Sequence, residues 1–459
     1  MITVFGTGTG APLDEAARSA VRGAALVVGG RRHLEAAGVP AGVRQVVLGP
    51  LAPALEAIER LLSADGEMSK ACPAIEDEAE GRSAGPRTRS NDSPHAPARV
   101  VVLASGDPGF FGIVRALADR FGPDALDVRP GVSSVATAFA RVGLPWDDAT
   151  VVSAHGRALR TAVNACRAHP KVAVLTGPGS GPAELGAELA RRAENRTLVV
   201  ATALGDPAGE RVERVTPAEA AARDWGASVS VVLCLDEERA VTAAARTVAG
   251  PRTGPGRWAL AEEEFSHRDS MITKFEVRAL ALARLGPRVG DLVWDIGAGS
   301  GSVAVECARL GAAVTAVEKT ADGVERVRAN AAAHGVDVLA VHGAAPTVLS
   351  DLADPDAVFV GGGGRELTAI VTACARRARR AVVVSLAAVD RVPAVRAALL
   401  RAGFDCDGVL LQSSRLAPLP GEVTRLAATN PVFLLWGTRP AAPGAEPVGS
   451  NSFTEGVVQ

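Results

Sequence analysis

Short apolar segments alternate along the chain with longer segments in which apolar residues recur at helical spacing. In the first half, strand-like runs lead into glycine- and proline-rich turns or into helical stretches such as 182–193. This alternation predicts an α/β fold. The strands predicted for this half cover residues 2–5, 26–28, 99–104, 126–129, 150–153, 172–175 and 197–201.

The second half repeats the pattern and predicts a doubly wound sheet. Two final strands, 408–412 and 431–436, are expected to pair antiparallel at its edge. Thr273 is expected to cap a helix that starts at Phe275, because Glu276 stands at the capping-box offset from it. The other predicted elements are strands 292–296, 313–318, 337–342, 357–360 and 381–385 and helices 275–285, 321–333, 366–378 and 390–401.

Three segments interrupt the pattern. Residues 64–98 hold many Ser, Gly, Pro and charged residues with almost no large apolar side chains, which predicts a disordered insertion. Residues 241–257 are typical of a linker, and 438–459 of a loose tail. A chain of 459 residues exceeds the roughly 250–300 residues over which one core keeps growing. We therefore expect two domains, 1–240 and 258–437.

Composition narrows the functional classes. A net charge of −2 argues against a non-specific nucleic-acid binder, and no tyrosine is present to act as an acid or base. Six cysteines form no C-x-x-C pair, and no H-E-x-x-H or similar spacing predicts a metal site. The first residues lack the pattern of a signal peptide, and no run of ~18 apolar residues occurs. These features predict a cytoplasmic protein without a membrane span.

The most informative stretch is the glycine-rich loop that follows the strand at 292–296. Gly297, Gly299 and Gly301 alternate, but the sixth position of the G-x-G-x-x-G frame is Ser302, so the dinucleotide fingerprint fails. Asp295 precedes the loop, and Glu318 ends the next strand, 21 residues after Gly297. Two carboxylates placed this way suit S-adenosylmethionine, with one near the aminopropyl end and one on the ribose hydroxyls. The alternative is a tight turn without a ligand.

Glycine-rich loops also follow three strands of the first half, at 6–10, 105–109 and 130–134. Such loops present main-chain donors and acceptors to a ligand, and three of them imply one shared cleft. Basic residues at 31–33 and a histidine at position 155 would suit a polyanionic substrate if they face this cleft.

Two family resemblances rest on these motifs and their neighbours. The first half resembles the tetrapyrrole methyltransferases in its first glycine loop and in residues 28–34, 105–108, 130–134 and 155–157. The second half resembles the class I methyltransferases that decarboxylate a cobalamin precursor, in residues 265–268, 271–274, 295–301, 354–362, 424–426 and 430–433. The resemblance implies an N-terminal fold of two α/β subdomains followed by a Rossmann-like domain.

The resemblance also implies an activity: methylation of carbons 5 and 15 of a corrin precursor, with loss of carbon dioxide from the ring C acetate. The resemblance implies S-adenosylmethionine as the cofactor, a small-molecule tetrapyrrole as the substrate and a homo-oligomer as the assembly. Carried over by motif, the cofactor residues are Gly8, Gly106, Asp107, Ser133 and Ser134 in the first half, and Thr273, Asp295, Gly297, Ala298, Gly299, Ser300, Gly301, Glu318 and Ala345 in the second.

Decarboxylation needs cations that hold the other carboxylates of the substrate. Candidates in or near the matched motifs are Arg268, Lys274, Arg415 and Arg425, with His267 as a proton donor or relay. For each of them, a solvated surface residue or a structural histidine is the alternative. Two other functions stay open: methylation of RNA or of another small molecule by the second half, and non-catalytic sensing of a tetrapyrrole or of S-adenosylmethionine.

Overall fold

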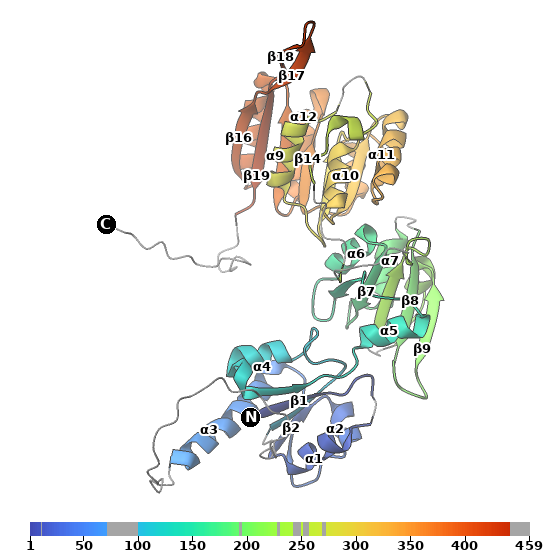
Figure 1. The fold of residues 1–459 in the computed structure, drawn as a ribbon, viewed down its shortest axis with the longest axis vertical. Helices are drawn as coiled ribbons and strands as arrows, with labels where there is room; N and C mark the ends of the chain where they lie inside the picture. Colours follow the sequence, from blue (N-terminus) through green and yellow to red (C-terminus); the bar gives the residue numbers. More distant parts are fainter. Residues whose placement is uncertain are drawn as a thin grey trace, which may run out of the picture. The chain divides into compact units, whose positions relative to one another are not determined.

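The computed structural model describes residues 1–10, 12–70, 100–191, 195–226, 230–241, 249–250, 257–268 and 272–440 (Figure 1). The chain forms two compact units, Met1–Arg157 with Ala173–Ala249, and Ala158–Val172 with Gly250–Gln459. This division differs from the predicted boundary at 240, because helix α6 (Leu159–Ala168) packs on a strand of the second unit. Most of the predicted insertion, linker and tail lies outside the described residues. Helix α3 (Leu51–Lys70) runs past position 64, where the insertion was expected to begin.

The first unit begins with a parallel five-stranded sheet in the order β3-β2-β4-β1-β5. Apolar side chains cover both of its faces, with Ile58 and Leu117 in one core and Val21 and Leu34 in the other. Its strands are β1 (Ile2–Gly6), β2 (Leu26–Gly29), β3 (Arg44–Val47), β4 (Val100–Ala104) and β5 (Leu126–Arg129). Beside α3, its helices are α1 (Glu15–Gly23), α2 (Arg31–Ala37), α4 (Val114–Phe121) and the short η1 (Pro123–Ala125).

A second five-stranded sheet follows in the order β6-β7-β10-β8-β9, and β8 runs antiparallel to both β10 and β9. The core between this sheet and α5 contains Phe139, Val199 and Leu233. Its strands are β6 (Thr150–Ser153), β7 (Lys171–Leu175), β8 (Thr197–Thr202), β9 (Arg211–Val215) and β10 (Ser230–Leu235), and its helices are α5 (Ser134–Val142), α7 (Pro182–Ala190) and α8 (Pro217–Ala221).

The second unit contains a seven-stranded sheet in the order β13-β12-β11-β14-β15-β19-β16. Its first five strands are parallel, while β19 is antiparallel to both β15 and β16, as predicted for the chain end. The strands are β11 (Leu292–Ile296), β12 (Ala313–Glu318), β13 (Leu339–His342), β14 (Ala357–Val360), β15 (Ala381–Leu386), β16 (Asp405–Leu411) and β19 (Val432–Thr438). A separate hairpin, β17 (Ser414–Leu419) with β18 (Val423–Ala428), was not predicted.

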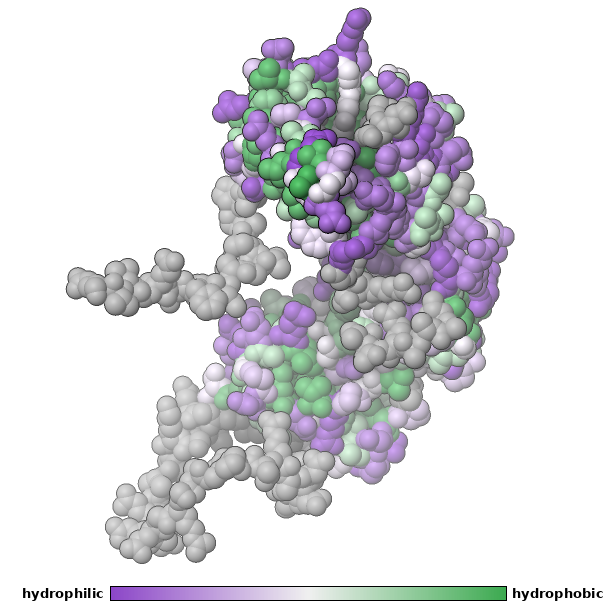
Figure 2. Space-filling model, turned by 45° about the horizontal axis from the view of Figure 1, so that its top comes forward, coloured by the Kyte–Doolittle hydropathy of each residue, from purple (hydrophilic) through white to green (hydrophobic). Residues whose placement is uncertain are grey.

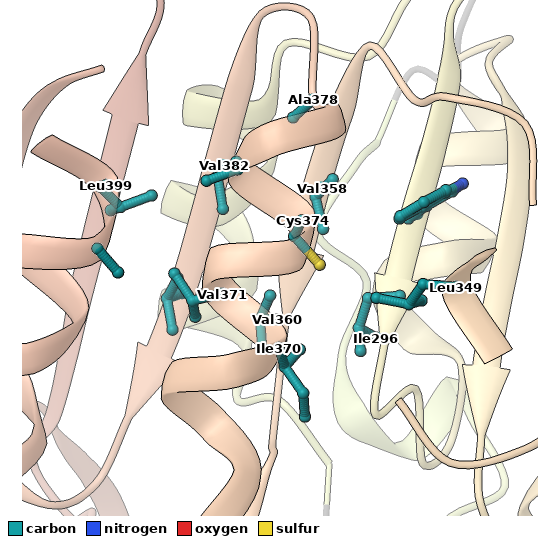
Figure 3. Close-up of a cluster of buried hydrophobic side chains, with 14 of the residues drawn as sticks. Ile296, Leu349, Val358, Val360, Ile370, Val371, Cys374, Ala378, Val382 and Leu399 are labelled. Carbon is teal, nitrogen blue, oxygen red and sulfur yellow. The ribbon is translucent and has the colours of Figure 1, made fainter. Parts of the chain in front are cut away.

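Helices cover both faces of this sheet. On one face α12 (Leu367–Arg377) lays Ile370, Val371 and Cys374 against β14 and β15 (Figure 3). On the other face, α9 and α10 pack through Leu282 and Val303. The remaining helices are α9 (Phe275–Leu285), α10 (Ser302–Arg309), α11 (Ala321–Ala333) and α13 (Val392–Arg401), with short turns η2 (Glu262–Glu264), η3 (Thr347–Asp351), η4 (Gly364–Glu366) and η5 (Val389–Arg391).

The surface carries a mixture of polar and apolar side chains on the face shown in Figure 2. Across the described residues, no helix has both the length and the apolar character needed to cross a membrane.

Candidate functional site

In the first unit, three glycine-rich loops meet because they follow adjacent parallel strands. Strands β4, β1 and β5 are neighbours, so their carboxyl ends lie at one edge of the sheet. The Gly106 N–H donates to the Gly8 carbonyl at 2.7 Å, which joins the first two loops. A Cβ atom on Gly131 would lie 2.6 Å from both Gly8 N and Gly106 O. The third loop therefore packs backbone against backbone on the other two, so the three loops meet as the strand order requires.

The polar side chains predicted to bind the cofactor in this cleft are engaged within their own loops. The Asp107 carboxylate accepts from the Gly109 N–H at 2.8 Å. The Ser133 hydroxyl accepts from the Ala136 N–H at 3.1 Å and caps α5, which begins at Ser134. These contacts fix loop shape. The groups left to face a ligand here are mainly those of the main chain.

A fourth loop adjoins the first one and was missed from the sequence. Gly205 has a φ of +83°, and a Cβ atom placed on it would lie 1.8 Å from the Thr9 carbonyl oxygen. Only a glycine allows this approach. A lone glycine between β8 and β9 gave no signal of it, because the contact is between segments almost two hundred positions apart.

Two basic clusters predicted near the cleft differ in structure. The Arg32 guanidinium donates to Ser105 Oγ at 2.9 Å, and Ser105 Oγ lies 3.2 Å from His33 Nε2. Burial and the Arg32 charge lower the pKa of His33, which favours its neutral form. This cluster stands beside the 105–109 loop because β2 neighbours β4. By contrast, His155 Nδ1 lies at hydrogen-bond distance, 3.2 Å, from the Thr176 carbonyl oxygen, which is typical of a structural histidine.

In the second unit, the glycine loop lies where the strand order reverses, between β11 and β14. Gly297, Gly299 and Gly301 all have positive φ values, +73°, +57° and +72°, which explains their alternation. The loop after β14 approaches closely, since the Gly361 N–H donates to the Ile296 carbonyl at 2.9 Å and a Cβ on Gly297 would lie 3.2 Å from Gly362 N. Ligands of open α/β sheets bind in such a crevice.

The two predicted carboxylates flank this loop in different states. Asp295 is 1% exposed, and its carboxylate accepts from the Ala304 N–H of α10 at 3.0 Å. Burial raises the pKa of Asp295 to about 7. Glu318 accepts from the Gly299 N–H at 3.0 Å and from Thr320, and the absence of a side chain on Gly323 leaves room for it. Glu318 thus contacts the loop directly, whereas Asp295 joins a strand to a helix.

The remaining loop residues are held by main-chain bonds. The Ala298 N–H donates to the Val317 carbonyl at 3.2 Å, and the Gly301 N–H donates to the Ala298 carbonyl at 2.7 Å. Ala345 follows β13 and packs partly buried against the core. Its loop is placed beside Glu318 because the Gly343 N–H donates to the Glu318 carbonyl at 3.0 Å.

Asn330 organises this site, although the sequence gave no hint of it. This α11 residue is 3% exposed, and its amide donates to the carbonyls of Ser266 and Ser300 at 2.8 and 2.7 Å. Its oxygen accepts from the Ser266 N–H at 2.8 Å. The Asn330 side chain therefore joins the 265–268 motif to the glycine loop, and nothing in the sequence indicated that these two motifs are linked.

The predicted capping role of Thr273 is wrong. The N-cap of α9 is Lys274, without a side-chain bond, and Glu276 turns to Arg415 instead of the backbone. A carboxylate from elsewhere in the chain takes the capping role, since Glu262 accepts from the Phe275 N–H at 3.0 Å. The Thr273 carbonyl instead accepts from Arg278, a fully buried arginine, at 2.6 Å.

Among the predicted cations, Arg415 is committed to an ion-pair network. Its guanidinium contacts Glu262 and Glu276, each at 2.8 Å. Burial opposes ionisation of Glu262, but the bonds from Arg415 and the Phe275 N–H hold the pKa of that carboxyl at about 2. Arg415 therefore attaches β17 to α9 and is poorly placed to hold a substrate carboxylate as well.

The other candidates are placed differently. Within the described part of the chain, Lys274 and Arg425 form no ion pair. Arg268 is exposed next to His267. The Nδ1 atom of His267 is buried and has no hydrogen-bond partner among the described residues. No cluster of three or more His, Cys, Asp or Glu side chains suited to a metal ion occurs in the same residues.

Known proteins match both halves. A model of the tetrapyrrole (corrin/porphyrin) methylases matches residues 1–221, and one of a precorrin methyltransferase domain matches residues 263–438. A probable cobalt-precorrin-6B C(15)-methyltransferase (decarboxylating) of Pyrobaculum calidifontis is 34% identical over 192 residues, which are 40% of this chain and 96% of that relative. The chain belongs to the precorrin methyltransferase family.

Two further relatives of this family member carry related names. A precorrin-6Y C(5,15)-methyltransferase [decarboxylating] of Sinorhizobium is 40% identical over 271 residues, 58% of this chain and 63% of the relative. The chain thus matches less than two thirds of that relative's length. A cobalt-precorrin-7 C(5)-methyltransferase of Salmonella typhimurium is 34% identical over 140 residues, 30% of this chain and 66% of the relative.

Proposed function

We propose that the chain methylates precorrin-6Y at C5 and C15 and removes the ring C acetate carboxylate at C12, giving precorrin-8X in cobalamin biosynthesis. The first unit would methylate C5, and the second would methylate C15 and decarboxylate. The observation that supports this best is that each matched domain has a set of glycine-rich loops at the carboxyl ends of its parallel strands. The names of the matched relatives supply the reaction.

The chemistry of these loops suits S-adenosylmethionine as the cofactor of both units. Positions Gly8 and Gly299 both have positive φ, and a Cβ atom on Gly299 would meet nothing within 4 Å, so open space borders that loop. The Glu318 carboxylate beside Gly299 suits a pair of ribose hydroxyls. When bound, this cofactor supplies an activated methyl group on its sulfonium.

The work left to the protein is mainly alignment, a source of up to ~7–11 kcal/mol of barrier reduction in the best cases. Loops held rigid by main-chain bonds, such as Gly106 on Gly8 and Gly361 on Ile296, suit that task. Decarboxylation further needs cations and a proton donor. In the second unit Lys274, Arg268 and Arg425 would hold carboxylates of the substrate, and His267 would hold a proton at its ring.

We further propose that the protein is a cytoplasmic homo-oligomer. The β17–β18 hairpin supports the assembly, because Leu416 and Leu426 pair across its strands and are 78% and 67% exposed. Two such hairpins would remove apolar surface from water by meeting.

The test is a mass measurement. Precorrin-6Y and S-adenosylmethionine are incubated with the full chain, and the product should gain two methyl groups and lose one carbon dioxide. Binding without any change in mass would support a sensor and refute the proposal. Gly299→Arg should abolish C15 methylation and spare C5, while Gly8→Arg should do the reverse.

Matched controls separate cleft blockage from backbone strain. Gly335 has a φ of +64° and Gly143 one of +67°, and a Cβ atom on either meets nothing within 4 Å. Gly335 follows the end of α11 and Gly143 ends α5, outside the glycine-rich loops, so Gly335→Arg and Gly143→Arg impose similar backbone strain without enlarging a loop residue. If the controls lose the same activities as Gly299→Arg and Gly8→Arg, the assignment of one cofactor cleft to each unit is refuted.

A further inference from the structure

Two phenylalanines stand exposed directly after the 105–109 loop of the first unit. The rings of Phe110 and Phe111 meet edge to face, with centroids 5.0 Å apart and planes at 74°. They are 37% and 50% exposed. The Arg157 guanidinium lies 5.7 Å from the centre of the Phe111 ring. An aromatic pair and a cation therefore form one surface, which we call the aromatic platform.

The backbone of Phe111 is in an unfavourable conformation. Its φ is +55°, a region that bulky side chains rarely adopt. The turn is fixed by Gly112, because a Cβ there would lie 2.4 Å from the Pro108 carbonyl oxygen, and by the bond from the Val114 N–H to the same oxygen at 3.1 Å. The Phe111 ring is thus exposed to water although its backbone is left-handed, a conformation that asparagine or glycine adopts more easily.

Stability does not explain this arrangement, but its position suggests a binding role. The platform continues from Gly106 and Asp107, and Gly106 is the residue that joins this loop to the first glycine loop by its bond to Gly8. Strained, exposed residues that the surrounding fold over-determines are typical of ligand clamps. The chemistry of the platform is equally specific, since ring faces and a guanidinium suit a flat conjugated molecule that carries carboxylates.

We propose that Phe111, with Phe110 and Arg157, forms the surface against which the tetrapyrrole ring is held for methyl transfer in the first unit. These are positioning residues, because they orient the acceptor carbon and take no part in bond making. The inference rests on the proposed function, which supplies the acidic macrocycle as substrate.

The test uses the full chain with Phe111→Asn, because asparagine accepts the left-handed backbone. The melting temperature should stay equal or rise, since strain and exposed apolar area are both removed. The KM for the tetrapyrrole in C5 methylation should rise about tenfold, with kcat changed much less. The affinity for S-adenosylhomocysteine should not change. Phe111→Tyr, which keeps the ring, should retain a KM close to that of the original chain.

A second arm keeps the inference testable if no methylation occurs at all. Uroporphyrin III, a flat macrocycle with carboxylate substituents, serves as a probe, and its binding is followed by quenching of its fluorescence. Phe111→Asn should weaken this binding about tenfold as well. Equal binding to both chains, or a lower melting temperature with an unchanged KM, would overturn the inference. Glu422→Gly, which relieves a φ of +59° in the β17–β18 turn, should change neither KM nor probe binding.

Discussion

Replacing Asn330 by alanine should loosen the second unit at one defined place. The side chain makes three hydrogen bonds, two to Ser266 and one to the Ser300 carbonyl, and it lies in α11 with 3% of its surface exposed. Its removal would separate the 265–268 segment from the glycine loop. Both segments would keep their own secondary structure.

The magnitude follows from which partners water can reach. Ser266 lies at the surface, so water replaces its two lost bonds at a cost of about 0.5 kcal/mol each. Ser300 is 3% exposed, and leaving its carbonyl without a partner costs about 1–3 kcal/mol. The sum is about 2–4 kcal/mol, which corresponds to roughly thirty- to a thousandfold more frequent local opening.

Hydrogen exchange with peptide resolution measures this opening directly. Peptides from the glycine loop and from the start of α10 should lose protection by that factor, and C15 methylation should fall while C5 methylation stays constant. Arg328→Ala is the control, since that exposed residue of the same helix pairs, among the residues that the structure describes, only with the exposed Glu325. Unchanged protection of the loop, or an equal loss of both methylations, would refute the role given to Asn330.

Three other substitutions test separate features. Burial raises the pKa of Asp295 to about 7, so ionisation of this carboxyl opposes folding. The advantage in unfolding free energy of Asp295→Asn over the original chain should therefore grow as the pH rises from about 4 to 7, by at most about 1.4 kcal/mol per pH unit. Equal denaturant midpoints across that range would contradict this. Arg415 holds the pKa of Glu262 at about 2, so Arg415→Met should lower the free energy of unfolding at neutral pH. The variant should also lose less stability than the original chain on acidification from pH 4.5 to 2. Identical acid unfolding profiles would show that the ion pair adds nothing. Gly131→Ala should abolish C5 methylation alone, because its Cβ would lie 2.6 Å from Gly8 N, whereas Gly49→Ala, with nothing within 4 Å, should be active.

Much of the fold could be predicted because the buried strands are short apolar runs. The doubly wound sheet, the antiparallel strands at its end and the meeting of the three loops all follow from strand order and strand ends. The β17–β18 hairpin could not be predicted, since most of its side chains are exposed on both faces and no apolar alternation marks it.

The missed or misjudged site residues share a different cause. Asn330 stands in an alanine-rich helical run, where a polar residue normally faces water, and only the fold shows that it is buried. Glu262, and not Thr273, caps α9, because the fold brings this carboxylate to the Phe275 N–H from thirteen positions earlier in the chain. Arg415 was a candidate for the site because it stands near a matched motif, but its contacts with Glu262 and Glu276, carboxylates distant in sequence, decide what it does.

The close packing of Gly6, Gly8, Gly106 and Gly131 has a practical consequence for mapping this protein. Alanine substitutions at the other positions delete side chains and leave such a surface of peptide groups in place, so only substitutions of the glycines themselves, such as Gly131→Ala, disturb it. Scans that enlarge residues, with every glycine replaced in turn by a larger one, would reveal the outline of such a surface. Natural variation in the side chains around these glycines would then indicate which methyl acceptor is selected, more than whether the methyl donor binds.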